Sequence, residues 1–379
     1  MKILVLCAKT ESLFWFRMPM MQAFQAAGYT VYAAGDAPES EWASEFLPRG
    51  IVYRQIPVSR NGTNPLADLK LLRALERLLR EIQPDKIFAF QAKPIAYGAV
   101  AAKRCGISGF YPLIAGLGSI FRGEGTKARL LRRILSVQYK AACRYAPAVI
   151  LQNPDDRDEL VRLGVLDPEK ARLIHGSGVD VERFGVTPLP ETPTMLFVGR
   201  LIKDKGIVEY LDACRIVKAA YPEARCMLVG PFDTNPSAMQ PAELEAYTSD
   251  GTVEYCGEQA DVLPFLEKAS VFVLPSYHEG TPKSVLEAMS CGRAIVTTDA
   301  PGCRETVRDG VNGYLVPVKD AAAVAEKALA LLRDPALCAA FGAQSRTIAE
   351  DVFDVNKVNA DIMDIMDIQP KGVEQYVSV

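Results

Sequence analysis

Short apolar runs alternate with amphipathic segments along the first half of the chain. Lys2 to Cys7 has the continuous apolar pattern of a buried strand, Phe16 to Ala27 has helical spacing, and Tyr29 to Ala34 is a second apolar run. The same order is repeated downstream, with helices expected at residues 68–82 and 97–105 and strands at 86–90, 111–114 and 148–152. This alternation predicts an α/β fold built on a doubly wound parallel sheet.

A proline-rich segment separates this pattern from a second one. Val186 to Pro193 contains three prolines in eight residues, which is typical of a linker. Downstream, strands are expected at residues 194–198, 226–229, 253–255, 271–274 and 294–297, and helices at 207–220 and 262–268. Because 379 residues exceed one ordinary core, we expect two Rossmann-like domains, residues 1–185 and 186–348, that face each other across a cleft.

The segment after the apolar run 269–274 carries the clearest candidate chemistry. Its loop contains Glu279, Gly280, Thr281 and Pro282. A helix is expected at residues 284–291, and its free N-terminal amides would bind an anion. Glu279 and Glu287 flank this position, and carboxylates repel phosphate but accept hydrogen bonds from the vicinal hydroxyl groups of a sugar. The alternative is an ordinary strand–helix unit whose glutamates are solvated.

A second candidate site follows the strand expected at 194–198. The sequence there runs from Gly199 through Arg200 and Lys205 to Gly206. Arg200 can bind two phosphate oxygens at once and Lys205 can act as a point charge, so a diphosphate would be held at this turn. The alternative interpretation is a solvated basic turn.

Charge is distributed unevenly along the chain. The net charge is -3, but residues 1–180 hold 25 Lys and Arg against 17 Asp and Glu, whereas the remainder holds 18 against 29. The first half is therefore expected to meet an anionic surface or acceptor, and no nucleic-acid partner is expected. Nine cysteines without a C-x-x-C pair favour a reducing cytoplasm over a zinc site or disulfides. No signal peptide or membrane-spanning run is expected.

Asp156 and Asp158 form a D-x-D pair, a pattern that can bind a metal ion. Asn153 and Pro154 precede them, so we interpret the segment as a helix N-terminus with a capping residue and acidic residues in its first turn. We expect no metal and no cofactor, because Arg200 and Lys205 can supply the positive charge.

A basic helix is expected at residues 129–144. At about 100° per residue, one face carries Arg129, Arg132, Arg133, Lys140 and Arg144, and the other carries Leu130, Leu131, Ile134, Leu135 and Ala142. We expect the apolar face to pack and the basic face to meet the cytoplasmic membrane surface or an acceptor diphosphate, aided by Ile120 and Phe121. A solvated surface helix is the alternative.

The segment from Glu279 resembles the donor-binding signature of glycosyltransferase family 4, retaining enzymes of the GT-B fold. The pattern E-G-x-P-x-x-x-L-E-A-x-x-x-G is present as Glu279 to Pro282, Leu286 to Ala288 and Gly292. The resemblance implies that Glu287 binds the nucleotide ribose and Glu279 the donor sugar. It also implies that Gly199, Arg200 and Lys205 bind the diphosphate, and that the loop containing Glu258 borders the base.

In the first half, Phe16 to Pro19 and Gly116 to Ser119 resemble a subgroup that extends undecaprenyl-diphosphate-linked sugars. The resemblance implies an acceptor site there, with Gly116, Gly118 and Arg17. We expect Arg17 to lie at the start of a helix and to contact a phosphate. Many relatives have a histidine after the fourth strand that approaches the donor sugar, where this chain has Phe90-Gln91-Ala92-Lys93. We expect Lys93 to take the place of this histidine as the catalytic contact. A C-terminal helix at about 349–368 would cross back to the first domain.

The resemblance therefore implies a metal-independent retaining glycosyltransferase. It would transfer a hexose or N-acetylhexosamine from a UDP-sugar to a lipid-linked saccharide in polysaccharide assembly, at the cytoplasmic face of the membrane. Three alternatives remain: a two-lobed sugar-binding protein, a GT-B enzyme with a soluble acceptor, and a nicotinamide-dependent dehydrogenase. The dehydrogenase would need G-x-G-x-x-G after Leu6, where residues 7–12 contain no glycine.

Overall fold

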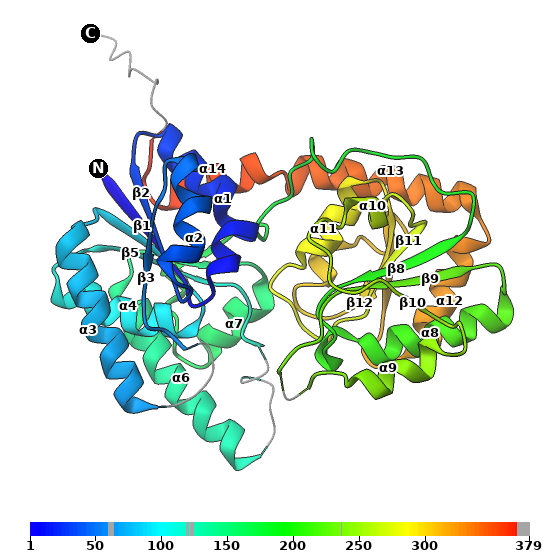
Figure 1. The fold of residues 1–379 in the computed structure, drawn as a ribbon, viewed down its shortest axis with the longest axis horizontal. Helices are drawn as coiled ribbons and strands as arrows, with labels where there is room; N and C mark the ends of the chain where they lie inside the picture. The colour runs from blue at the N-terminus through cyan, green and yellow to red at the C-terminus, as the bar shows by residue number, and fades with distance from the viewer. Residues whose placement is uncertain (60–63, 119–120, 122–124, 236, 370–379) are drawn as a thin grey trace, which may run out of the picture. The chain divides into compact units, whose positions relative to one another are not determined.

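The chain folds into two compact units in the computed structural model, which describes residues 1–59, 64–118, 121, 125–235 and 237–369 (Figure 1). Unit 1 comprises Met1–Ser177 and Asn356–Val379, and unit 2 comprises Gly178–Val355. Each unit has its own parallel sheet and its own core, and the two are described separately.

Unit 1 contains a parallel sheet in the order β3-β2-β1-β4-β5-β6-β7. Its strands are β1 (Lys2–Leu6), β2 (Thr30–Gly35), β3 (Val52–Gln55), β4 (Lys86–Phe90), β5 (Gly109–Ile114), β6 (Val149–Leu151) and β7 (Ala171–Leu173). Its helices are α1 (Thr10–Ala26), α2 (Glu39–Phe46), α3 (Pro65–Ile82), α4 (Ala92–Arg104), α6 (Thr126–Tyr145), α7 (Pro154–Arg162) and α14 (Val355–Ile365). Helices α3, α4 and α6 contribute to the core on one face of the sheet, and α1 and α14 to the core on the other.

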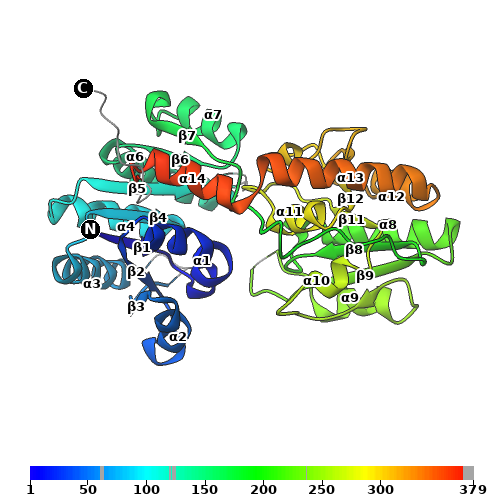
Figure 2. The same cartoon turned by 90° about the horizontal axis from the view of Figure 1, so that it is seen from above.

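The chain returns to unit 1 through α14 (Figure 2). Val358, Ile362 and Met366 are buried in the same core as α1, and Lys86 Nζ donates a hydrogen bond to the Met366 carbonyl at 2.6 Å. The segment expected to form one crossing helix is therefore two helices, because α13 (Pro335–Val352) ends in unit 2 before α14 begins.

Unit 2 contains a second parallel sheet in the order β10-β9-β8-β11-β12-β13. Its strands are β8 (Thr194–Val198), β9 (Arg225–Val229), β10 (Glu254–Tyr255), β11 (Val271–Leu274), β12 (Ala294–Thr298) and β13 (Gly313–Val316). Its helices are α8 (Ile207–Ala220), α9 (Pro241–Thr248), α10 (Leu263–Leu266), α11 (Lys283–Ser290), α12 (Ala321–Leu332) and α13. The predicted doubly wound α/β fold is present in both units.

The units begin and end at other residues than the expected ranges 1–185 and 186–348. The chain joins the core of unit 2 before the prolines, since Val179 donates a backbone hydrogen bond to Phe353 at 2.8 Å and Phe184 is buried in that core. Within the described residues, no helix is both long and apolar enough to cross a membrane.

Candidate active site

The turn after β8 is bound tightly to the segment after β11. Gly206 has φ 71°, and a Cβ atom there would lie 2.0 Å from the carbonyl oxygen of Pro275, so only glycine permits this approach. The Asp204 carbonyl accepts hydrogen bonds from Ser276 Oγ at 3.1 Å and from the Tyr277 amide at 2.9 Å. Two segments about 70 residues apart thereby become one site.

An ion pair joins the two predicted motifs within this site. Lys205 Nζ lies on Glu279 Oε1, and the side chains are 21% and 11% exposed. Glu279 is fixed from another side, because its amide donates to the Pro301 carbonyl at 2.9 Å. The structure thus brings together the cation expected at the diphosphate and the carboxylate expected at the donor sugar.

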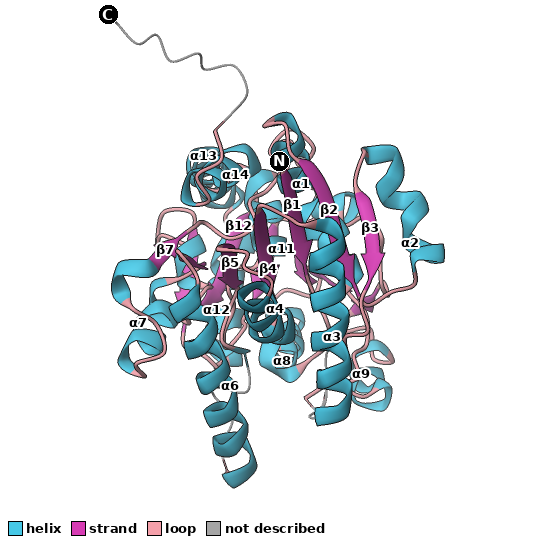
Figure 3. Ribbon diagram, turned by 90° about the vertical axis from the view of Figure 1, so that its left-hand side faces the viewer, coloured by secondary structure: helices cyan, strands magenta, loops and turns pink. Residues whose placement is uncertain are grey.

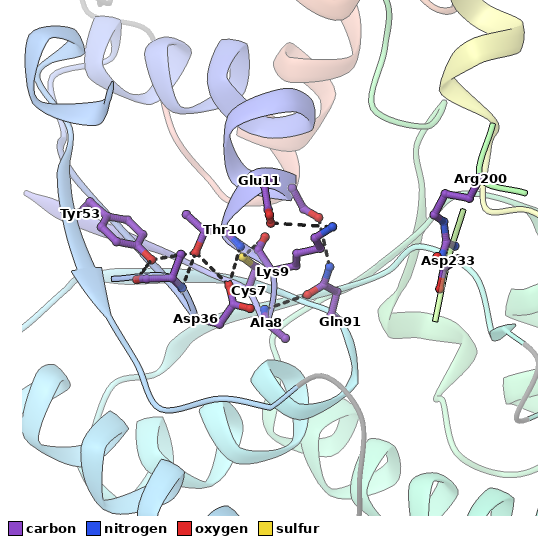
Figure 4. Close-up of polar contacts among 12 residues, drawn as sticks. Cys7, Ala8, Lys9, Thr10, Glu11, Asp36, Tyr53, Gln91, Arg200 and Asp233 are labelled. Carbon is purple, nitrogen blue, oxygen red and sulfur yellow. Dashed lines mark hydrogen bonds and ion pairs between the residues drawn. The ribbon is translucent and has the colours of Figure 1, made fainter. Parts of the chain in front are cut away.

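Arg200 is paired with a residue that the sequence did not indicate. Its Nη1 atom lies 2.7 Å from Oδ2 of Asp233, which is in the loop after β9 (Figure 4). The Arg200 side chain remains 37% exposed. A guanidinium has five N–H donors, so this pair orients the group and leaves other donors for an anion.

Glu287 lies in α11, beyond the end of β11. The carboxylate is 13% exposed, and its nearest described cation is Lys283 at 4.0 Å. Burial raises the pKa of Glu287 to about 7, partly offset by the positive charges of Lys283 and Arg183. A mostly enclosed carboxylate with one distant ion pair is suited to accept hydrogen bonds from a ligand diol.

The other predicted donor-site residues lie in the loops that follow strands β8, β10 and β11 of unit 2. Pro282 is buried at the N-cap of α11, which has no side-chain cap, and Gly280 and Thr281 precede it. Gly199 follows β8, whereas Glu258 is exposed in the loop after β10.

The predicted helix N-terminus is confirmed, with Asn153 as the capping residue and Asp156 in the first turn of α7. The Asn153 side chain accepts a hydrogen bond from the Asp156 amide at 2.8 Å, and Pro154 begins α7. Asp158 pairs with Arg157 at 2.7 Å. Among the described residues, no group of three or more His, Cys, Asp or Glu side chains could hold a metal ion.

Comparison with known proteins connects this site to a family. Residues 17–196 match the model described as "Glycosyl transferase 4-like domain", and residues 192–334 match "Glycosyl transferases group 1". The Campylobacter jejuni N,N'-diacetylbacillosaminyl-diphospho-undecaprenol alpha-1,3-N-acetylgalactosaminyltransferase is 30% identical over 351 residues, which cover 89% of this chain and 91% of that protein. The chain belongs to glycosyltransferase family 4.

A second sequence relative and one solved structure are also similar to this chain. An Escherichia coli enzyme named UDP-Gal:alpha-D-GlcNAc-diphosphoundecaprenol alpha-1,3-galactosyltransferase is 23% identical, over 74% of this chain and 75% of its own. Anabaena Alr3699/HepE in complex with UDP-glucose has a TM-score of 0.79 and 19% identity, covering 97% of this chain and 99% of that chain. The two sheets therefore form the GT-B fold, and the resemblance to this family is confirmed.

In unit 1 of the glycosyltransferase, Arg17 does not open a helix. Helix α1 begins at Thr10, and Arg17 lies in its middle, 3% exposed. The guanidinium lies over the rings of Phe88 and Phe90 at 5.7 and 5.4 Å, and burial lowers its pKa to about 10. Its Nε atom has no hydrogen-bond partner in the part of the chain that the structure describes. The role of Arg17 in acceptor binding stays a prediction.

Lys93 lies in the first turn of α4 and is engaged by a carboxylate. Its Nζ atom is 2.8 Å from Asp68 Oδ1, and the two side chains are 15% and 16% exposed. Burial and, to a smaller extent, the same carboxylate raise the pKa of Tyr97 to about 12. Gly116 and Gly118 follow β5 with φ of 120° and 66°. The catalytic role of Lys93 and the acceptor role of these glycines stay predictions.

A polar cluster after β1 was not found from the sequence. Asp36 accepts hydrogen bonds from the Thr10 amide and hydroxyl at 2.9 and 3.0 Å, and Thr10 Oγ1 lies 2.7 Å from the Tyr53 hydroxyl (Figure 4). Burial raises the pKa of Tyr53, although the Thr10 hydrogen bond opposes this effect. These residues are separated in sequence, so no local motif indicates the cluster.

Proposed function

We propose that this glycosyltransferase transfers a sugar from a UDP-sugar to a lipid-linked saccharide, with retention of the anomeric configuration. The observation that carries the donor assignment is the joining of Lys205 to Glu279 in unit 2, with Arg200 and Glu287 on the adjoining segments. Cations suit the diphosphate and carboxylates suit sugar hydroxyls, so one site can hold both parts of a nucleotide sugar.

The transfer breaks the bond between the anomeric carbon and the diphosphate oxygen and forms one to an acceptor hydroxyl oxygen. Arg200 and Lys205 stabilise the negative charge on the departing diphosphate. Glu279 accepts a hydrogen bond from the donor sugar, and Glu287 accepts hydrogen bonds from the ribose. The acceptor hydroxyl attacks from the face that the diphosphate leaves, and its proton passes to the departing diphosphate oxygen. No covalent enzyme intermediate forms, and neither a metal nor another cofactor is required.

Names of relatives support the acceptor class. The Campylobacter jejuni and Escherichia coli relatives are both named for undecaprenyl-diphosphate-linked acceptors, and the latter also for a UDP-sugar. We assign the acceptor to unit 1, with Arg17, Gly116 and Gly118 as contacts and Lys93 as the catalytic contact. The transferred sugar is a hexose or an N-acetylhexosamine.

Helix α6 supports peripheral attachment to the cytoplasmic face of the membrane. Leu130 and Ile134, which were expected to pack inward, are 60% and 46% exposed, and Val137 is 64% exposed. The expectation for Leu130 and Ile134 is wrong because α6 packs against the core of unit 1 through another set of residues, namely Leu135, Tyr139, Ala142 and Cys143. The N-terminal half of α6 projects from the other helices of unit 1 (Figure 3).

The exposed residues of α6 form a lipid-binding pattern. At about 100° per residue, Leu130, Ile134 and Val137 fall on one stripe, and exposed Arg129 and Arg133 lie beside it. An apolar stripe flanked by arginines fits an anionic lipid surface, where each cation contributes about 1 kcal/mol. Phe121 does not contribute as expected, because it is buried against Tyr139 at a ring distance of 6.4 Å. Ile120 lies outside the described residues.

A transfer assay tests the proposal. The purified enzyme is incubated with UDP-sugars, one at a time, and an undecaprenyl-diphosphate-linked saccharide, and the product linkage is determined. We expect an α-linked product from an α-linked UDP-sugar. Transfer only to soluble sugars would favour the soluble-acceptor alternative, and binding of donors without transfer or hydrolysis would favour a sugar-binding protein.

A further inference from the structure

Gln91 has an unusual backbone conformation directly after β4. Its φ is 70° and its ψ is 153°, a region that is unfavourable for residues with a side chain and is open to glycine. A glycine at position 91 would adopt this conformation without strain. The presence of glutamine therefore indicates that its side chain has a use that offsets the strain.

The Gln91 side chain spans the gap to the neighbouring strand. Its Oε1 atom accepts a hydrogen bond from the Ala8 amide at 2.8 Å, and its Nε2 atom donates to Ser12 Oγ at 3.4 Å. Strands β1 and β4 are adjacent, with Leu6 opposite Ala89. Gln91 thus holds both ends of residues 7–12, which comprise the connection after β1 and the first residues of α1 and which we call the β1–α1 loop. This segment contains no glycine.

The same loop is held on its other side by Thr10, which is bonded to Asp36 and Tyr53. Lys9 and Glu11 are not used for these contacts. Their side chains are 46% and 44% exposed, with Lys9 Nζ 3.9 Å from Glu11 Oε2 (Figure 4). A loop fixed from two sides thus presents an ammonium donor and a carboxylate acceptor at the carboxyl end of a parallel strand, where α/β sheets bind ligands.

We propose that Gln91 is a positioning residue that holds the β1–α1 loop in the shape that receives the acceptor saccharide, whose hydroxyl groups meet Lys9 and Glu11. This inference rests on the proposed function, because it takes unit 1 as the acceptor domain. Gln91 acts through the loop and does not itself contact the sugar. Loss of the side chain therefore changes acceptor use and leaves donor use unchanged.

The test compares two Gln→Gly substitutions at positive φ. Gln91→Gly removes the strain together with the loop contacts, whereas Gln83→Gly, at an exposed position with φ 49° after α3, removes strain only. For Gln91→Gly we expect kcat/KM for the lipid-linked acceptor to fall at least about tenfold, since small misplacements of a substrate are costly. We expect KM for the UDP-sugar to stay at the wild-type value and Tm not to fall. Gln83→Gly should have wild-type kinetics.

Wild-type kcat/KM for the acceptor in Gln91→Gly would overturn the inference while leaving the proposed function intact. Failure of the wild-type enzyme to use any lipid-linked saccharide would overturn the proposed function first. If Gln91→Gly does not fold, the Gln91→Glu variant tests the inference instead. Its carboxylate can still accept a hydrogen bond from the Ala8 amide but cannot donate one to Ser12. A lowered acceptor kcat/KM with unchanged donor KM supports the inference, and wild-type values in both contradict it.

Discussion

At the scale of single residues, Glu287 has the most informative environment. Its carboxylate is 13% exposed and its pKa is raised to about 7, chiefly by burial. The folded state therefore retains a proton that the unfolded chain releases near pH 4.5, and the contribution of this group to stability falls as the pH rises from about 4.5 to 7. A nucleotide sugar whose ribose hydroxyl groups donate hydrogen bonds to the ionised carboxylate favours loss of that proton.

We predict that UDP-glucose binds more tightly at pH 8 than at pH 6. If only the ionised form accepts the ribose hydrogen bonds, a pKa of about 7 makes the difference about tenfold. UDP-glucose is the appropriate probe because its diphosphate is a diester and does not titrate in this range. The measurement is calorimetric Kd as a function of pH, and Glu287→Gln should remove the dependence. Equal affinities of the wild type at both pH values would contradict the assigned role.

At the scale of elements, the sequence predicted motifs better than their partners. Arg200, Lys205 and Glu279 were found because each motif lies within one continuous segment after a strand. Asp233, 33 residues from Arg200, was not found, because the two meet only when β8 and β9 pair. Gln91 was noted only as a departure from the family histidine, since its contact with the loop after β1 depends on the adjacent strands.

The limits of helix α1 and the faces of α6 show the same dependence on tertiary contacts. Helix α1 begins at Thr10 because Asp36, which directly follows β2, accepts hydrogen bonds from the Thr10 amide and hydroxyl. Leu130 and Ile134 have the apolar character of core residues, yet they are exposed because α6 packs through another stripe. Composition alone does not reveal which of two apolar stripes a helix buries.

We predict that the exposed stripe of α6 is required for lipid binding. The triple substitution of Leu130, Ile134 and Val137 by serine should reduce cosedimentation with vesicles containing anionic lipid, because it removes the apolar residues that insert. Substitution of Arg129 and Arg133 by serine should reduce the dependence on anionic lipid. Leu66→Ser on α3, at a residue 79% exposed, is the matched control. Equal binding by all variants, or no binding by the wild type, would remove the membrane assignment.

At the scale of the whole molecule, the two units of the GT-B fold differ in the charged and polar residues that they carry. Unit 2 carries the charged residues that we assign to the donor site, and unit 1 carries polar loops and the basic helix α6. The net positive charge of the first half and the negative charge of the second follow this division. The fold class was predictable because both halves repeat strands and helices in a regular order.

We predict that transfer does not require a divalent metal. We assign to Arg200 and Lys205 the positive charge that offsets the diphosphate, and the described residues include no group of three or more His, Cys, Asp or Glu side chains that could hold a metal ion. The rate of transfer measured with EDTA should stay near that without it. An activity lost in EDTA and restored by magnesium or manganese would contradict this expectation.

The affinity for UDP of two lysine variants from the turn after β8 tests the donor-site assignment most directly. Lys205 reaches Glu279 inside the site, whereas Lys203 pairs with Glu243 at 2.9 Å and is 46% exposed. A charged hydrogen bond contributes roughly 1.5–3 kcal/mol, so Lys205→Ala should weaken UDP binding by about 10- to 150-fold. Lys203→Ala should bind UDP as the wild type does, with Tm measured for both variants. Wild-type affinity in folded Lys205→Ala would contradict the assignment of this turn to the donor diphosphate.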